Sequence, residues 1–186
     1  MTTIAYTHGY LAADRLMTAG DTIVSNRTSK IYVGRDRSSE EKLIVLVGSG
    51  LYTNIIQTFD FVINGSKPGN KSSINFDLYP EQYQNDFEVW VFHEDDGIYL
   101  LDKSLIKQPI FALDDRYIAM GSGTQAALAA MICGKNATEA VIVASKLDVF
   151  TGSGTIRGIN VWEHLGWESN KWYRPFVKDE ETEKWI

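Results

Sequence analysis

Short apolar runs alternate with polar or glycine-containing breaks over the first fifty residues, a pattern typical of β-strands joined by turns. Residues 3–6 and 10–13 predict a hairpin with a glycine at its turn. Further strands are expected at 22–24 and 30–33. The continuous apolar run 43–47 predicts a strand that is buried on both faces.

Helical spacing of apolar residues begins after the glycines that follow this strand. Apolar positions recur at intervals of three and four over 51–63, which predicts a helix. The alanine-rich stretch 124–133 predicts a second helix. Asn136 followed by Glu139 has the pattern of a capping box and begins a third helix, which is expected to run to about Phe150.

The remaining apolar runs predict strands at 88–92, 97–101, 110–113, 117–120 and 155–161. The first two of these flank Asp95-Asp96-Gly97, which is a hairpin signal. Residues 64–87 are polar and broken, and they predict at most one short helix, at 80–85. The order of strands, one helix, strands, two helices and strands is not the β-α-β alternation of a parallel sheet. It predicts the α+β class with antiparallel sheets.

Composition limits the classes of function. The 186 residues include 18 Lys and Arg against 24 Asp and Glu, and the resulting net charge of −6 argues against a nucleic-acid or anionic-membrane partner. The length suits one domain, and a single cysteine, Cys133, cannot form an internal disulfide. No apolar run approaches the ~20 residues of a membrane span, and the three histidines lack metal-ligand spacing. We therefore expect a soluble, cytoplasmic protein with no metal and no cofactor.

The N-terminus carries the sharpest chemical signal. The side chain that follows Met1 is small, so removal of Met1 is expected and leaves Thr2 with a free α-amine. A threonine hydroxyl is a weak nucleophile unless a base takes its proton. The α-amine of an N-terminal threonine is such a base, with an ordinary pKa of roughly 7.7–8.0. Many chains begin with Met-Thr, so this pattern gains weight only from the motifs that follow it.

Several short motifs, weak one by one, occur in a meaningful order. They are Thr2-Thr3-Ile4-Ala5, Ala12-Ala13-Asp14-Arg15, Thr18-Ala19-Gly20, Lys30, the strand that ends in Gly48, Gly121-Ser122-Gly123 before the alanine-rich helix, and Asp148-Val149-Phe150-Thr151-Gly152. In this order they resemble the proteasome β-subunit and the bacterial HslV-type protease. The resemblance covers residues 2–63 and 110–161. It implies the four-layer α/β/β/α sandwich of N-terminal-nucleophile hydrolases, as a single domain over 1–186 with 162–186 as a C-terminal extension.

The resemblance also implies roles for individual residues. The catalytic set would be Thr2, Asp14, Lys30, Gly48, Ser122, Asp148 and Thr151. Thr2 would be the nucleophile, with Asp14 pairing with Lys30 so that the lysine charge favours the neutral α-amine. The Gly48 N–H would stabilise the oxyanion, and the last three residues would form a hydrogen-bonding cluster around the terminus. Met17, Thr28 and Leu46 match positions that line the specificity pocket and suggest an apolar preference.

The implied activity is that of a threonine endopeptidase that cleaves polypeptides inside a self-compartmentalised ring of at least six chains. A separate ATPase unfoldase is a further partner that the resemblance suggests. Exposed tail residues such as Trp167 and Trp172 would need cover in such an assembly. Two alternatives stay open, a catalytically inactive ring-forming homologue and a small-amide hydrolase of the same superfamily. An intact Met1 would favour the first, and a sealed small pocket the second.

Overall fold

The structure is a computed structural model that describes residues 2–19, 22–37, 41–64, 87–102, 108–109, 117–152, 154 and 156–167. Its strands are β1 (Thr3–Thr7), β2 (Tyr10–Asp14), β3 (Met17–Ala19), β4 (Thr22–Ser25), β5 (Ile31–Arg35), β6 (Leu43–Gly50), β7 (Phe87–His93), β8 (Gly97–Leu101), β9 (Gln108–Pro109), β10 (Ile118–Gly121) and β11 (Ile156–Asn160). Its helices are α1 (Tyr52–Ile63), α3 (Thr124–Ile132), α4 (Ala137–Leu147) and α5 (Val161–Leu165).

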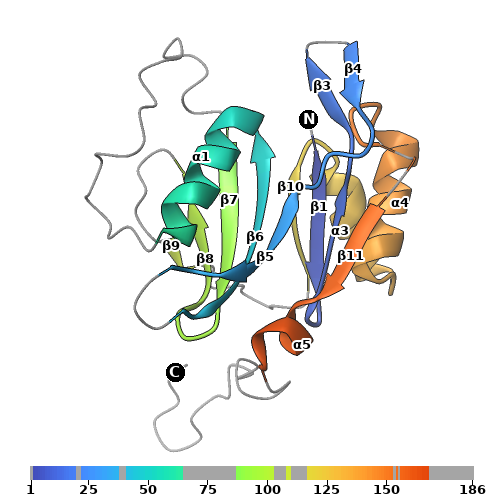
Figure 1. Cartoon of the computed structure of the whole chain (residues 1–186). Helices are drawn as coiled ribbons and strands as arrows, with labels where there is room; N and C mark the ends of the chain where they lie inside the picture. Colours follow the sequence, from blue (N-terminus) through green and yellow to red (C-terminus); the bar gives the residue numbers. More distant parts are fainter. Residues whose placement is uncertain are drawn as a thin grey trace, which may run out of the picture.

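The strands form antiparallel sheets, as the sequence predicts. One sheet has the order β10-β1-β2-β11, and another has the order β5-β6-β7-β8-β9. The hairpin of β3 and β4 is paired separately from both. In Figure 1 the two larger sheets lie side by side, with α1 beside one and α3 and α4 beside the other. The chain is therefore a mixed α/β fold with antiparallel sheets.

Alternation along the strands divides the core into three apolar clusters. The central cluster joins Ile4 and Leu11 of one sheet to Val45 and Phe92 of the other. The opposite side of β1 and β2 carries small residues that pack against α3 and α4. The opposite side of β6 and β7 packs against α1. Because successive strand side chains point to opposite faces, each central strand is buried on both sides. The run at 43–47 is buried on both faces as predicted.

Strand β6 is longer than its apolar run. The sequence prediction stops at Val47, whereas β6 continues to Gly50. The extension is held by pairing with β7, in which Gly48 is opposite Val89 and Gly50 is opposite Phe87. Backbone hydrogen bonds therefore continue the strand where side-chain pattern gives no signal.

Helix α4 begins as predicted and ends early. Asn136 and Glu139 form both hydrogen bonds of the capping box. The expected end near Phe150 is wrong, because α4 ends at Leu147. Asp148 leaves the helical conformation, and its carboxylate accepts a hydrogen bond from the Phe150 N–H at 3.1 Å. Such a local side-chain bond competes with continuation of the helix.

The start of the expected C-terminal extension belongs to the folded body. Helix α5 was not predicted; the Asn160 side chain accepts from the Glu163 N–H at its start, and Gly166 ends it in a left-handed conformation. The expectation that Trp167 is exposed is wrong, because it is 7% exposed, lies in the central cluster and donates its ring N–H to the Glu94 carbonyl at 3.0 Å.

Three expectations fall outside the described residues, namely the helix at 80–85, the strand at 110–113 and the environment of Trp172. Within the part of the chain that the structure describes, no helix combines the length and the apolar character needed to cross a membrane.

Candidate active site

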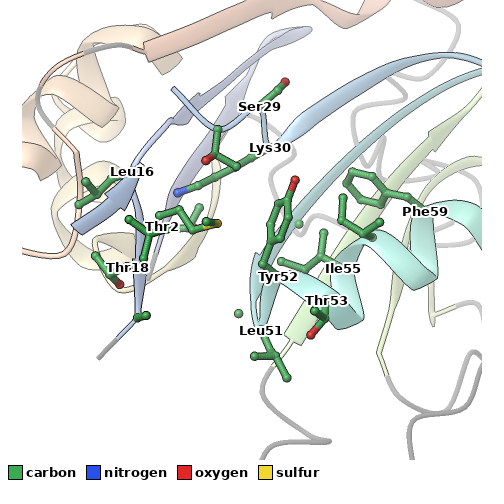
Figure 2. A pocket seen from close by; sticks show the side chains of 17 residues that line it. Thr2, Leu16, Thr18, Ser29, Lys30, Leu51, Tyr52, Thr53, Ile55 and Phe59 are labelled. Atoms are coloured by element: carbon green, nitrogen blue, oxygen red, sulfur yellow. The ribbon is translucent and has the colours of Figure 1, made fainter. Parts of the chain in front are cut away.

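Thr2 lies at the head of β1 and lines a pocket of about 340 Å³. Lys30 and Gly48 line the same pocket, so that residues from three separate parts of the chain meet there. Figure 2 shows the Lys30 side chain extending toward Thr2, with α1 forming the opposite side of the pocket. Thr2 is 4% exposed, so its surroundings are set by the protein more than by bulk water.

Asp14 is the most heavily bonded carboxylate of the site. It ends β2, is fully buried, and its Oδ1 lies 2.9 Å from the Lys30 ammonium. The same oxygen accepts the Thr3 N–H at 2.8 Å. Its Oδ2 accepts the N–H groups of Leu16 at 3.0 Å and Gly152 at 3.1 Å. A buried carboxylate with this many donors is well compensated for the loss of water.

Lys30 sits immediately before β5 and is 7% exposed. Burial lowers the pKa of Lys30 below its ordinary value of 10.5, while the charge and hydrogen bond of Asp14 oppose that change. The contact with Asp14 fixes the position of the Lys30 side chain at the pocket that Thr2 also lines. A charge fixed there disfavours a second positive charge on a neighbouring amine.

Ser122, Asp148 and Thr151 form a second polar cluster. The hydroxyls of Ser122 and Thr151 donate to Asp148 Oδ2, at 2.5 Å and 2.6 Å. Burial raises the pKa of Asp148, but the hydrogen bonds from Ser122, Thr151 and the Phe150 N–H together lower it by more. The pKa of Asp148 therefore lies below its usual value. The Ser122 N–H donates to the Thr2 carbonyl at 2.9 Å, which ties this cluster to the head of β1.

Gly121 makes that close approach of the two backbones possible. It has a φ of +94°, and a Cβ at this position would collide with the Thr2 carbonyl oxygen. A side chain would therefore be strained in conformation and would push Ser122 away from Thr2. The Gly-Ser-Gly motif acts through its backbone as well as through its serine.

Gly48 has a different steric role. A Cβ at Gly48 would lie 2.5 Å from Ile55 Cγ2, so the glycine lets α1 pack closely against β6. Among the described residues, β5 pairs with β6 only as far as Val47. Beyond Val47 the described pairing of β6 is with β7, and Gly48 and Gly50 line the pocket.

The chain resembles known structures in fold rather than in sequence. No protein-family model matches it, and no curated protein matches its sequence. The structure of Thiobacillus denitrificans BPH in complex with epoxomicin is similar, with a TM-score of 0.56 and 18% identity, over 85% of this chain and 96% of that one. This chain has a proteasome-like fold. At this identity the likeness speaks to the fold alone.

Within this proteasome-like fold, two of the three residues that were expected to line the specificity pocket are found at this pocket. Met17 and Thr28 line it. Leu46 does not line this pocket, because it is fully buried in the cluster beneath α1. Leu46 and Gly48 point to the same face of β6 because they are two residues apart. Leu46 lies further along the strand from the pocket, where α1 covers it.

Sequence reasoning missed the contribution of helix α1 to the pocket. Five of the missed lining residues are apolar and lie on that helix or immediately before it: Leu51, Tyr52, Ile55, Ile56 and Phe59. The sequence shows the helical spacing of these residues, but it does not show which other segments of the chain the helix would face. Among the described residues, no group of His, Cys, Asp and Glu side chains could hold a metal ion.

Proposed function

We propose that this chain is an N-terminal-nucleophile hydrolase that cleaves peptide bonds with the Thr2 hydroxyl, once Met1 has been removed. The observation that carries the proposal is that Thr2, Lys30 and Gly48 line one pocket although the sequence separates them widely. The similar structure contains epoxomicin, an inhibitor of the N-terminal threonine proteasome. That ligand is consistent with a threonine nucleophile in this fold.

In the proposed reaction the Thr2 hydroxyl attacks the substrate carbonyl while its own α-amine accepts the hydroxyl proton. The amine then gives this proton to the departing substrate nitrogen, which leaves an ester between the acyl fragment and Thr2. Water hydrolyses the ester and restores the hydroxyl. Lys30, held by Asp14 at 2.9 Å, keeps the α-amine neutral by like-charge repulsion, because a protonated amine cannot act as a base.

Oxyanion stabilisation is assigned to the Gly48 backbone. The tetrahedral intermediate places a negative charge on the former carbonyl oxygen, and a fixed N–H donor lowers its energy. Gly48 lines the pocket and lacks a β5 partner among the described residues. The neighbouring apolar lining, with Met17, Ile55 and Phe59, suits a large apolar side chain of the substrate.

The proposal includes the four-layer α/β/β/α arrangement and assembly into a ring of six or more chains. The three apolar clusters support the layers, because each helix–sheet and sheet–sheet contact has its own. Exposed apolar residues such as Ile132, Leu147 and Val149, which are 68%, 73% and 85% exposed, support association. Sedimentation velocity at micromolar concentration tests assembly, and a stable monomer would contradict it.

Mass spectrometry and peptide hydrolysis together test the nucleophile. We expect intact mass to show that Met1 is absent and epoxomicin to add one adduct, at Thr2. Thr2→Ala should fold and be inactive, whereas Thr2→Ser should retain activity because serine keeps the hydroxyl. Blocking the amine with an extension that cannot be trimmed should inactivate as fully as Thr2→Ala, because an amide nitrogen is not a base.

The same experiment separates the alternatives. Hydrolysis by the blocked protein or by Thr2→Ala at the wild-type rate would eliminate the proposed mechanism. A folded protein that retains Met1 and cleaves no peptide is the inactive homologue. Cleavage of small amides but not of peptides identifies the amidase.

A further inference from the structure

Thr3 uses both its N–H and its hydroxyl in hydrogen bonds, although it has no role in the proposed reaction so far. It is fully buried on β1, next to the proposed nucleophile. Its N–H donates to Asp14 at 2.8 Å, and its hydroxyl accepts from the Gly123 N–H at 3.1 Å. The same hydroxyl lies 2.5 Å from the Thr151 hydroxyl. Thr3 therefore contacts both polar clusters of the site.

The direction of the bond between the two hydroxyls follows from counting protons. A threonine hydroxyl has one proton to donate and lone pairs to accept with. Thr151 gives its proton to Asp148 Oδ2 at 2.6 Å. The proton between Thr3 and Thr151 must then come from Thr3. The chain of donation runs from the Gly123 N–H through Thr3 and Thr151 to the Asp148 carboxylate.

The peptide group between Thr2 and Thr3 is held at both of its polar ends. Its carbonyl accepts from the Ser122 N–H at 2.9 Å, and its N–H donates to Asp14. The Thr3 side chain adds a third anchor on the α3–α4 side of the sheet, where a Cβ at Gly123 would collide with the Thr3 hydroxyl. Three anchors leave this peptide group little freedom to rotate.

We propose that Thr3 is a positioning residue, which joins the Asp14–Lys30 pair to the Ser122–Asp148–Thr151 cluster and so orients the Thr2 hydroxyl and amine. The inference rests on the proposed function, because it assigns Thr3 a role in the reaction of Thr2. Thr3 acts through its neighbours, and it does not line the pocket. Its loss should therefore change kcat and leave KM unchanged.

Thr3→Val is the informative substitution, because valine has the shape of threonine and lacks the hydroxyl. It leaves the Gly123 N–H without its acceptor and Thr151 without its donor. We expect kcat to fall by about tenfold or more, as for the loss of a buried hydrogen bond linked to a charged group. The pKa of Asp148 should rise, because cooperative support of the Thr151 donation is lost. The charges of Asp14 and Lys30, on the other side of Thr3, stay the same.

Two further variants make the test specific. Thr3→Ser keeps the hydroxyl and should restore both kcat and the Asp148 titration, and it remains informative if Thr3→Val does not fold. Thr58→Val is the matched control. Thr58 is also a fully buried threonine, and its hydroxyl bonds only to the Asn54 carbonyl of α1, at 2.8 Å, among the contacts described. Its substitution should lower stability and leave kcat and Asp148 unchanged.

Peptide kinetics and carbon-13 NMR titration of Asp148 would be measured on all three variants and the wild type. Unchanged kcat and unchanged Asp148 titration in Thr3→Val overturn the inference, as does an equal loss of kcat in Thr58→Val or in Thr3→Ser. Failure of the proposed function shows in the wild type itself, as absence of both hydrolysis and the epoxomicin adduct. In that case the NMR titration still decides whether Thr3 supports Asp148.

Discussion

The Lys30 ammonium lies 2.9 Å from Asp14 Oδ1, and both side chains are almost completely removed from water. The two partners are not equivalent, because Asp14 also accepts three backbone N–H groups, from Thr3, Leu16 and Gly152. Lys30→Met removes one donor of four and leaves the carboxylate satisfied. Asp14→Asn removes the negative charge that faces the buried Lys30 ammonium and turns an amide N–H₂ toward backbone donors.

We predict that both variants lose peptide hydrolysis but differ in stability. Lys30→Met should cost about 1–3 kcal/mol of the free energy of unfolding, and Asp14→Asn about 3–5 kcal/mol. Urea unfolding and peptide hydrolysis measure the two effects. Hydrolysis by Lys30→Met at the wild-type rate would remove the lysine from the mechanism. Equal stability of the two variants would contradict the inference that Asp14 contributes more to stability than Lys30 does.

Gly48→Ala tests the close packing of α1 on β6. The new Cβ would lie 2.5 Å from Ile55 Cγ2, so strand or helix must shift. We expect a loss of about 1–3 kcal/mol in stability and a fall in kcat of up to about 100-fold if the proposed oxyanion donor moves by an ångström.

Ile55→Ala supplies the matching partner in a double-mutant cycle. It removes the clashing methyl group, so the two substitutions should couple favourably, by about 0.5–3 kcal/mol. Strict additivity of the unfolding free energies would show that the Gly48–Ile55 contact is not what excludes alanine.

Ile56→Glu tests substrate preference at the pocket. Ile56 lines the pocket and is 41% exposed, so the fold should tolerate a carboxylate there. Among peptides, kcat/KM should fall by at least about tenfold for a large apolar side chain at the cleavage site and rise for a basic one. The gain for the basic peptide should shrink with added salt. Ile142→Glu, at a position on α4 that is 40% exposed and outside the pocket lining, is the control and should leave both values unchanged.

Acid stability tests the hydrogen bonding of Asp148. Burial raises the pKa of Asp148, but its hydrogen bonds lower the pKa below the ordinary 3.8. The folded protein therefore binds this proton more weakly than the unfolded chain does. The stabilisation is complete above 3.8 and is lost as the pH falls through the lower, folded-state pKa.

Comparison with Asp148→Asn isolates this contribution. The wild type should be more stable than the variant near pH 6, and the difference should vanish toward about pH 2. Urea midpoints across this range provide the measurement. A difference that is constant with pH would mean that Asp148 titrates normally in the folded protein.

Local patterns were sufficient for most elements. The hairpin around His8 and Gly9, the helix 51–63 and the capping box at Asn136 all depend on residues close in sequence, and each is present. The order of strands and helices was likewise sufficient to predict a mixed fold of helices and antiparallel sheets. Helix α5 was missed because five residues are too short to show a helical period.

Tertiary structure alone decided which residues share the site and how they are bonded. Sequence and resemblance named Thr2, Lys30 and Gly48, but their common pocket exists only because β5 pairs with β6 and that sheet packs against the sheet of β1. Burial of Trp167 and Leu46 depends on what packs over them, which no local pattern contains. The role of Thr3 is of the same kind. Its hydroxyl looks inert in sequence, and only the approach of Gly123 and Thr151, more than a hundred residues away, gives it partners.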